Sequence, residues 1–91
     1  MGMEIVLFKS EEPKSLTDVS AFLRELADKL DTNKVVLRQG EQEIEVTLPD
    51  NVVLELKVEE EDKKGKKQYQ LEVEIEWYEG GAKGGGPVTL G

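Results

Sequence analysis

The chain has 91 residues, and its 20 acidic and 12 basic side chains give a formal net charge of −8 at pH 7. It contains no His and no Cys. This composition excludes disulfide bonds and argues against zinc sites and against Ser-His-Asp or Cys-His catalysis. The negative charge repels phosphate backbones, so we expect no nucleic-acid partner.

No stretch of the sequence approaches the roughly 20 apolar residues of a membrane span. The first residues also lack the basic and apolar regions of a signal peptide. We therefore expect a cytoplasmic protein with no membrane partner. The length suits a single domain, which we place at residues 1–79. Residues 80–91 contain two glycine runs and are predicted to form a flexible tail.

The first half of the chain predicts a strand and a helix. Residues 4–9 are a short apolar run, which is typical of a strand buried on both faces. A helix is predicted over residues 15–31, with Ser15 as N-cap and Asp18 in the capping-box position. Asn33 is expected to adopt the left-handed conformation that ends it. The apolar side chains of the predicted helix recur at spacings of three and four: Leu16, Val19, Phe22, Leu23, Leu26, Ala27 and Leu30.

After the helix, the apolar period changes from 3.6 to 2, which predicts an antiparallel meander with one wet face. The predicted strands cover residues 35–38, 43–48, 52–58 and 69–78. The predicted turns between them cover residues 39–42, 49–51 and 59–67. The last of these turns gathers four lysines behind four acidic residues, so we interpret it as a solvated loop neutralised by its own neighbours.

The helix and the sheet each have one apolar surface, and each can bury that of the other. We therefore expect an α+β two-layer sandwich, in which one helix packs on a five-stranded, mainly antiparallel sheet. The predicted order of elements is β-α-β-β-β-β. The sequence leaves open where the first strand inserts.

Three segments carry a resemblance to a known family: residues 8–12, residues 19–30 and the closing residues 74–77 of the last amphipathic strand. In these segments the chain resembles the Amphi-Trp domain family, and the resemblance covers roughly residues 5–78. Thr32 and Asn33 depart from it, because a glycine is expected after the helix. The resemblance implies a fold like the one above, and it supplies no activity, cofactor or catalytic residue.

Trp77 is the single tryptophan and falls in the apolar register of the last strand. We interpret it as a core anchor, together with Phe22 and Leu26 of the helix, because aromatic side chains dominate small cores. A ligand-stacking platform is the alternative interpretation of Trp77. The core interpretation predicts that replacing Trp77 by alanine unfolds the domain.

The outer face of the sheet is predicted to present carboxylates interrupted by a few apolar side chains. We interpret this face as a candidate surface for a protein partner or a weak homodimer, and a plainly solvated face is the alternative. Glu55 is expected to lie near a glutamate of the last strand. The candidate surface comprises Glu43, Glu45, Glu55, Glu72, Glu74, Glu76, Val36, Val53 and Tyr78.

These features predict a small interaction module that presents an acidic sheet face or an edge strand to a protein. A cation-binding protein and a small carboxylate-dependent hydrolase are the alternatives. Carboxylates that project in parallel from a sheet converge poorly on one ion, and glycoside hydrolysis needs a cleft that holds two of them. We therefore predict no enzyme, no catalytic residue, no metal site and no cofactor.

Overall fold

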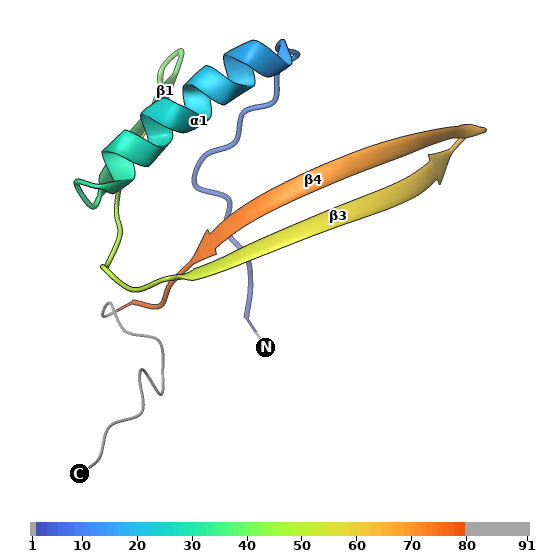
Figure 1. Ribbon diagram of the computed structural model, residues 1–91. Helices are drawn as coiled ribbons and strands as arrows, with labels where there is room; N and C mark the ends of the chain where they lie inside the picture. Colours follow the sequence, from blue (N-terminus) through green and yellow to red (C-terminus); the bar gives the residue numbers. More distant parts are fainter. Residues whose placement is uncertain (1, 80–91) are drawn as a thin grey trace. The chain divides into compact units, whose positions relative to one another are not determined.

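The computed structural model describes residues 2–79. This part of the chain contains one helix and four strands, drawn in Figure 1, and its class is α+β as predicted. The contacts divide the chain into two compact units, one ending at Leu48 and the other beginning at Pro49. The predicted tail, residues 80–91, lies outside the described residues. The elements are α1 (Leu16–Leu30), β1 (Lys34–Gln39), β2 (Gln42–Thr47), β3 (Val53–Lys63) and β4 (Lys66–Glu76).

Helix α1 begins and ends within one residue of its predicted bounds. The Ser15 hydroxyl accepts a hydrogen bond from the backbone N–H of Asp18 at 3.0 Å, which confirms the predicted N-cap. After the helix, Asn33 has φ 63°, the left-handed conformation predicted for it. In the described residues, no helix has the length and apolarity that crossing a membrane requires.

Strands β1 and β2 form the first hairpin, whose ladder runs from Lys34 opposite Thr47 to Gln39 opposite Gln42. Two hydrogen bonds extend this ladder at its open end. The N–H of Leu48 donates to the Asn33 carbonyl at 2.8 Å, and the Asn33 side-chain amide donates to the Leu48 carbonyl at 2.9 Å. Helix α1 contacts β1 in the same unit.

The described residues contain two buried apolar side chains, and both belong to the first unit. Val35, at the start of β1, is 6% exposed, and Leu48, just after β2, is 8% exposed. The double hydrogen bond between Asn33 and Leu48 therefore lies next to the tightest packing of the described chain. This junction joins the end of the helix to the open end of the first hairpin.

Strands β3 and β4 form a second, longer hairpin, visible as the yellow and orange arm in Figure 1. Each strand has 11 residues, and the hairpin is closed by Lys64 and Gly65, with φ 52° and 81°. Positive φ at both central residues is the signature of a type I′ turn, whose twist matches that of paired strands. The prediction of a turn over residues 59–67 was therefore wrong, because both strands continue to this two-residue turn.

The predicted five-stranded sheet was also wrong. The described residues form two separate two-stranded antiparallel sheets, β1–β2 and β3–β4, and residues 4–9 form no strand. A strand exists through the pairing of its backbone groups, and an apolar run by itself supplies no pairing partner. Between the two hairpins, the backbone of Leu48 is already bonded to Asn33, and Pro49 has no N–H to donate.

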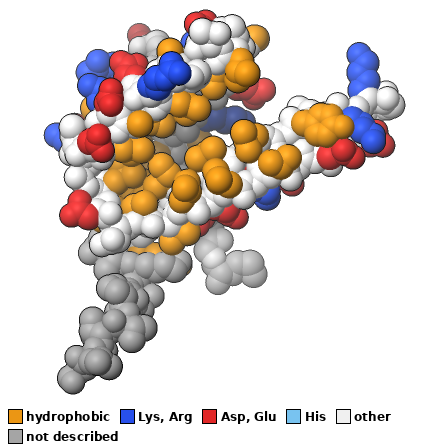
Figure 2. Space-filling model, in the orientation of Figure 1, with side chains coloured by type: hydrophobic (Ala, Val, Ile, Leu, Met, Phe, Trp, Pro, Cys, Tyr) orange, Lys and Arg blue, Asp and Glu red, His pale blue; other side chains and the backbone are white. Residues whose placement is uncertain are grey.

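The second hairpin is amphipathic, because directly opposed residues of β3 and β4 point to the same side of the sheet. Figure 2 shows hydrophobic side chains in a row along the arm that these strands form. We call this side the apolar face; its six exposed members are 56–72% exposed, and the seventh, Ile75, is half-buried. The apolar face comprises Leu54, Leu56, Val58, Tyr69, Leu71, Val73 and Ile75.

Candidate functional site

Four of the glutamates on the opposite side of the second hairpin lie toward its open end, and we call them the acidic cluster: Glu55, Glu72, Glu74 and Glu76. Glu55 of β3 lies directly opposite Glu74 of β4, which confirms that it neighbours a glutamate of the last strand. Carboxylate oxygens of Glu55, Glu74 and Glu76 lie within 4.8 Å of one another, and all three residues are exposed. Three like charges are therefore held together in water by the register of the strands.

The pKa of the Glu74 carboxyl is raised above its ordinary value. The first cause is the negative charge of Glu55 across the ladder, followed by partial desolvation and then by the charges of Glu76 and Glu72. The ammonium group of Lys57 acts in the opposite direction. The strand register thus leaves Glu74 with more negative charge around it than nearby lysine compensates.

Lys57 is the cation that pairs with a member of the acidic cluster, and no role was predicted for it. Its Nζ lies 3.3 Å from a carboxylate oxygen of Glu72 and 3.9 Å from one of Glu59. A hydrogen bond to Glu72, together with the charges of both glutamates, raises the pKa of Lys57. The sequence signal for this role was the position of Lys57 among the alternate, polar residues of β3, on the same side as Glu55. Among residues 2–79, no lysine or arginine forms an ion pair with Glu55, Glu74 or Glu76.

The structure divides the predicted acidic surface between its two units. Glu43 and Glu45 lie on β2, and each has a cation of β1 beside it: Arg38 at 2.8 Å and Lys34 at 3.6 Å, respectively. Val36, on β1 opposite Glu45, is partly exposed on the same side of that hairpin. The charges of Glu43 and Glu45 are therefore compensated locally, whereas three members of the acidic cluster are not.

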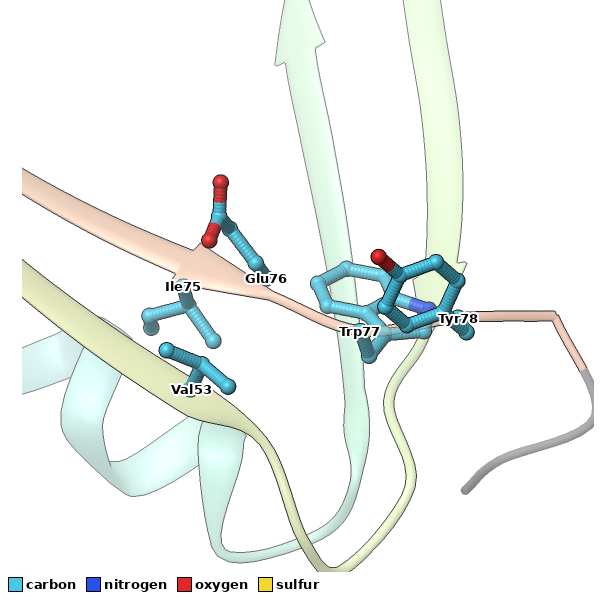
Figure 3. Close-up of a pocket in the computed structure, with 5 residues that line it drawn as sticks. All are labelled: Val53, Ile75, Glu76, Trp77 and Tyr78. Carbon is cyan, nitrogen blue, oxygen red and sulfur yellow. The ribbon is translucent and has the colours of Figure 1, made fainter. Parts of the chain in front are cut away.

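The base of the second hairpin is hollowed beside the acidic cluster. A shallow depression of about 360 Å³ is lined by Val53, Ile75, Glu76, Trp77 and Tyr78. Figure 3 shows the rings of Trp77 and Tyr78 just beyond the end of β4. The predicted surface residues Val53 and Tyr78 are thus brought next to Glu76. An aromatic and aliphatic floor with a carboxylate at its rim can receive the stem and the charged head of a long basic side chain.

The three predicted core anchors lie in different places. Phe22 and Leu26 line a hollow of about 530 Å³ between α1 and β1, within the first unit. Trp77 follows the last residue of β4 and is 37% exposed. Their role as core anchors stays a prediction.

The lysine-rich turn of the second hairpin agrees with its predicted neutralisation by neighbouring acids. Lys63 lies 3.6 Å from a carboxylate oxygen of Glu61, and Lys67 lies 3.6 Å from one of Glu60. Both pairs are exposed, so each contributes little to stability. These pairs place opposite charges next to each other near the turn of the hairpin. The sequence predicted a loop there, and the structure has paired strands.

We expect the Glu74 carboxyl to titrate above the ordinary pKa of a glutamate when its side chain is followed by NMR. Because the folded-state pKa of Glu74 is raised, the folded chain binds this proton more tightly than the unfolded chain does. The contribution of Glu74 to stability is therefore most favourable at low pH. It falls as the pH rises from the ordinary pKa of a glutamate through the raised value.

Glu55→Gln is expected to lower the pKa of Glu74, because it removes the largest cause of the shift. The matched control is Glu43→Gln, which changes a glutamate of the other hairpin that is paired with Arg38. An unchanged pKa of Glu74 in the Glu55→Gln variant would contradict the proximity of the two carboxylates.

Comparison with known proteins gives a family and no activity. No curated protein and no solved structure gave a significant match to the chain. The family model of the Amphi-Trp domain matches residues 1–91, which is the whole chain. The match carries no catalytic residue, cofactor or partner, and it agrees with the resemblance seen in the helix and in the Trp77 segment. The chain belongs to the Amphi-Trp domain family.

Proposed function

We propose that this chain is a non-enzymatic interaction module, and that the acidic cluster of the β3–β4 hairpin binds a basic segment of a protein partner. The observation that carries the proposal is the convergence of the Glu55, Glu74 and Glu76 carboxylates without an ion pair to a cation among residues 2–79. A lysine or arginine of a partner would supply the missing positive charge.

The electrostatics of the cluster favour a cationic ligand. The raised pKa of Glu74 reports repulsion from Glu55 and Glu76, and a bound ammonium or guanidinium group would relieve that repulsion. On β2, Glu43 and Glu45 already have Arg38 and Lys34 beside them. The second hairpin therefore offers the stronger site for a basic segment.

The setting of these carboxylates suits binding better than catalysis. Glu55, Glu74 and Glu76 are all exposed on the side of a two-stranded sheet. A catalytic carboxyl pair needs a cleft that excludes water and holds a substrate between the two groups. The depression beside Glu76 is shallow, and its aromatic floor gives it the character of a contact surface.

The test is a titration of the full chain with a short peptide of alternating lysine and threonine, followed by backbone amide NMR shifts. We expect saturable shifts in β3 and β4 around the acidic cluster, which weaken as salt screens the charges. The triple variant E55Q/E74Q/E76Q is expected to bind the peptide about tenfold more weakly, since each exposed charge pair contributes a few tenths of a kcal/mol to about 1 kcal/mol.

The matched control is the variant E43Q/E45Q, which neutralises two glutamates of the first hairpin and should leave peptide affinity unchanged. A peptide of alternating glutamate and threonine should not bind. Equal loss of affinity in the two sets of variants would show that net charge, and not the acidic cluster, attracts the peptide. Saturable shifts with Ca²⁺ but none with the basic peptide would favour the cation-binding alternative and contradict the proposal.

A further inference from the structure

We infer that β4 pairs edge to edge and antiparallel with β4 of a second copy of this chain. The pairing joins two β3–β4 hairpins into one four-stranded sheet, in the order β3, β4, β4, β3. It goes beyond the proposed function, because it joins the backbone edges of two copies, and it also places Lys66 of the second copy opposite Glu76 of the acidic cluster. It is carried by the open edge of β4 and by the order of charges along that strand.

The outer edge of β4 is open in the described part of the chain. The sheet has two strands, so β4 pairs with β3 on one side and with no described strand on the other. In an antiparallel sheet, every second residue of an edge strand points its N–H and C=O away from its neighbour. Over 11 residues these groups form a template for another strand.

The charges of β4 are arranged so that the strand complements itself. The strand begins with Lys66 and Lys67 and carries its acidic residues in its second half. If two copies pair antiparallel about Leu71, Lys66 of one copy lies opposite Glu76 of the other. The two glutamines face the remaining glutamates: Gln68 lies opposite Glu74, and Gln70 lies opposite Glu72 of the second copy.

The same register matches three of the four apolar side chains of β4, while Ile75 lies opposite Lys67 of the second copy. Leu71 meets its own symmetry mate, and Tyr69 lies opposite Val73 of the second copy. These three side chains are more than half exposed in the single chain, and cross-strand pairs of this kind stabilise sheets. A shift of the register by one residue would place apolar side chains opposite polar ones, so the alternation disfavours it.

The edge of β3 is not self-complementary in this way. Antiparallel pairing of two β3 strands about Val58 would place Glu55 opposite Glu61, and Leu56 opposite Glu60 of the second copy. Like charges and apolar-to-charged contacts of this kind disfavour pairing. The run of four acidic residues at 59–62 thus protects one edge of the hairpin, while the charge order of β4 leaves the other edge able to pair with itself.

Sedimentation equilibrium of the full chain over a range of concentrations tests the inference. We expect a concentration-dependent mass that approaches twice 10.2 kDa. Leu71→Lys should abolish the dimer, because it places two lysines opposite each other on the symmetry axis. The matched control is Val58→Lys, whose residue lies opposite Leu71 in the hairpin, on the same face, with the same 72% exposure. This control should remain dimeric.

A charge exchange tests the register. Lys66→Glu and Glu76→Lys should each weaken the dimer about tenfold, because each single change makes two symmetric like-charge pairs. Within the hairpin these residues face Lys63 and Val53, so neither change introduces a like-charge pair across β3 and β4. The double variant should restore dimerisation.

A monomeric mass at all concentrations would overturn the inference, and so would equal loss of the dimer in Leu71→Lys and Val58→Lys, which would indicate packing of two apolar faces. A double charge variant no better than the single ones would overturn the register. Binding of the basic peptide is followed separately by amide shifts around the acidic cluster. Failure of dimerisation is therefore distinguishable from failure of the proposed function.

Discussion

Replacing Leu48 by alanine is expected to lower the free energy of unfolding of the first unit by about 2–4 kcal/mol. Leu48 is 8% exposed and is one of two buried apolar residues among those described. Its backbone also closes the first hairpin through two hydrogen bonds with Asn33. A cavity beside this junction removes apolar contacts where the described chain has few others to replace them.

Urea unfolding followed by circular dichroism measures this loss, and hydrogen exchange of the Leu48 amide reports the opening of the hairpin end. The control is Leu16→Ala, the same chemical change in the same unit at a side chain that is 82% exposed. That variant should stay within about 0.5 kcal/mol of the parent chain. Equal losses in the two variants would show that the burial of Leu48 does not determine the stability of this unit.

The local features of the fold could be predicted from the sequence, because short-range physics determines them. The Ser15 cap and the apolar spacing of the following residues define α1, and both depend on contacts within one or two turns. The left-handed Asn33 follows in the same way from its position after the helix. Period-two alternation correctly predicted the side that residues 53–58 of β3 and residues 69–76 of β4 occupy.

The pairing of strands could not be predicted in this way, because alternation does not name a partner. The apolar run at residues 4–9 has the composition of a strand but pairs with none in the described chain. The charged segment 59–67 was predicted as a loop because loops are polar. Its two lysine–glutamate pairs and a type I′ turn at Lys64 and Gly65 instead allow paired strands.

Some features of the acidic cluster could be predicted from alternation, and others depend on strand pairing. Its same-face glutamates follow from alternation, and the closeness of Glu55 to a glutamate of β4 was predicted from a hairpin. The separation of Glu43 and Glu45 from this cluster was missed, because it depends on β2 and β3 belonging to different sheets. The role of Lys57 depends on its exact register with Glu72, which the sequence pattern does not determine.

We expect that replacing Trp77 by alanine unfolds the second unit. Trp77 follows β4 and contributes, with Val53, Ile75 and Tyr78, to the depression at the base of the hairpin. About two thirds of a tryptophan side chain removed from water corresponds to a loss of about 2–4 kcal/mol. Small domains have a total stability of about 5–15 kcal/mol, and an isolated hairpin has less.

The matched control is Tyr78→Ala, which removes a neighbouring aromatic side chain that is 58% exposed, compared with 37% for Trp77. Its effect should be smaller. Because Trp77→Ala removes the single tryptophan, thermal unfolding is followed by circular dichroism and not by fluorescence. A Trp77→Ala variant with the thermal stability of the parent chain would contradict the core interpretation. That result would instead favour Trp77 as a platform on which a ligand stacks, beside the carboxylate of Glu76.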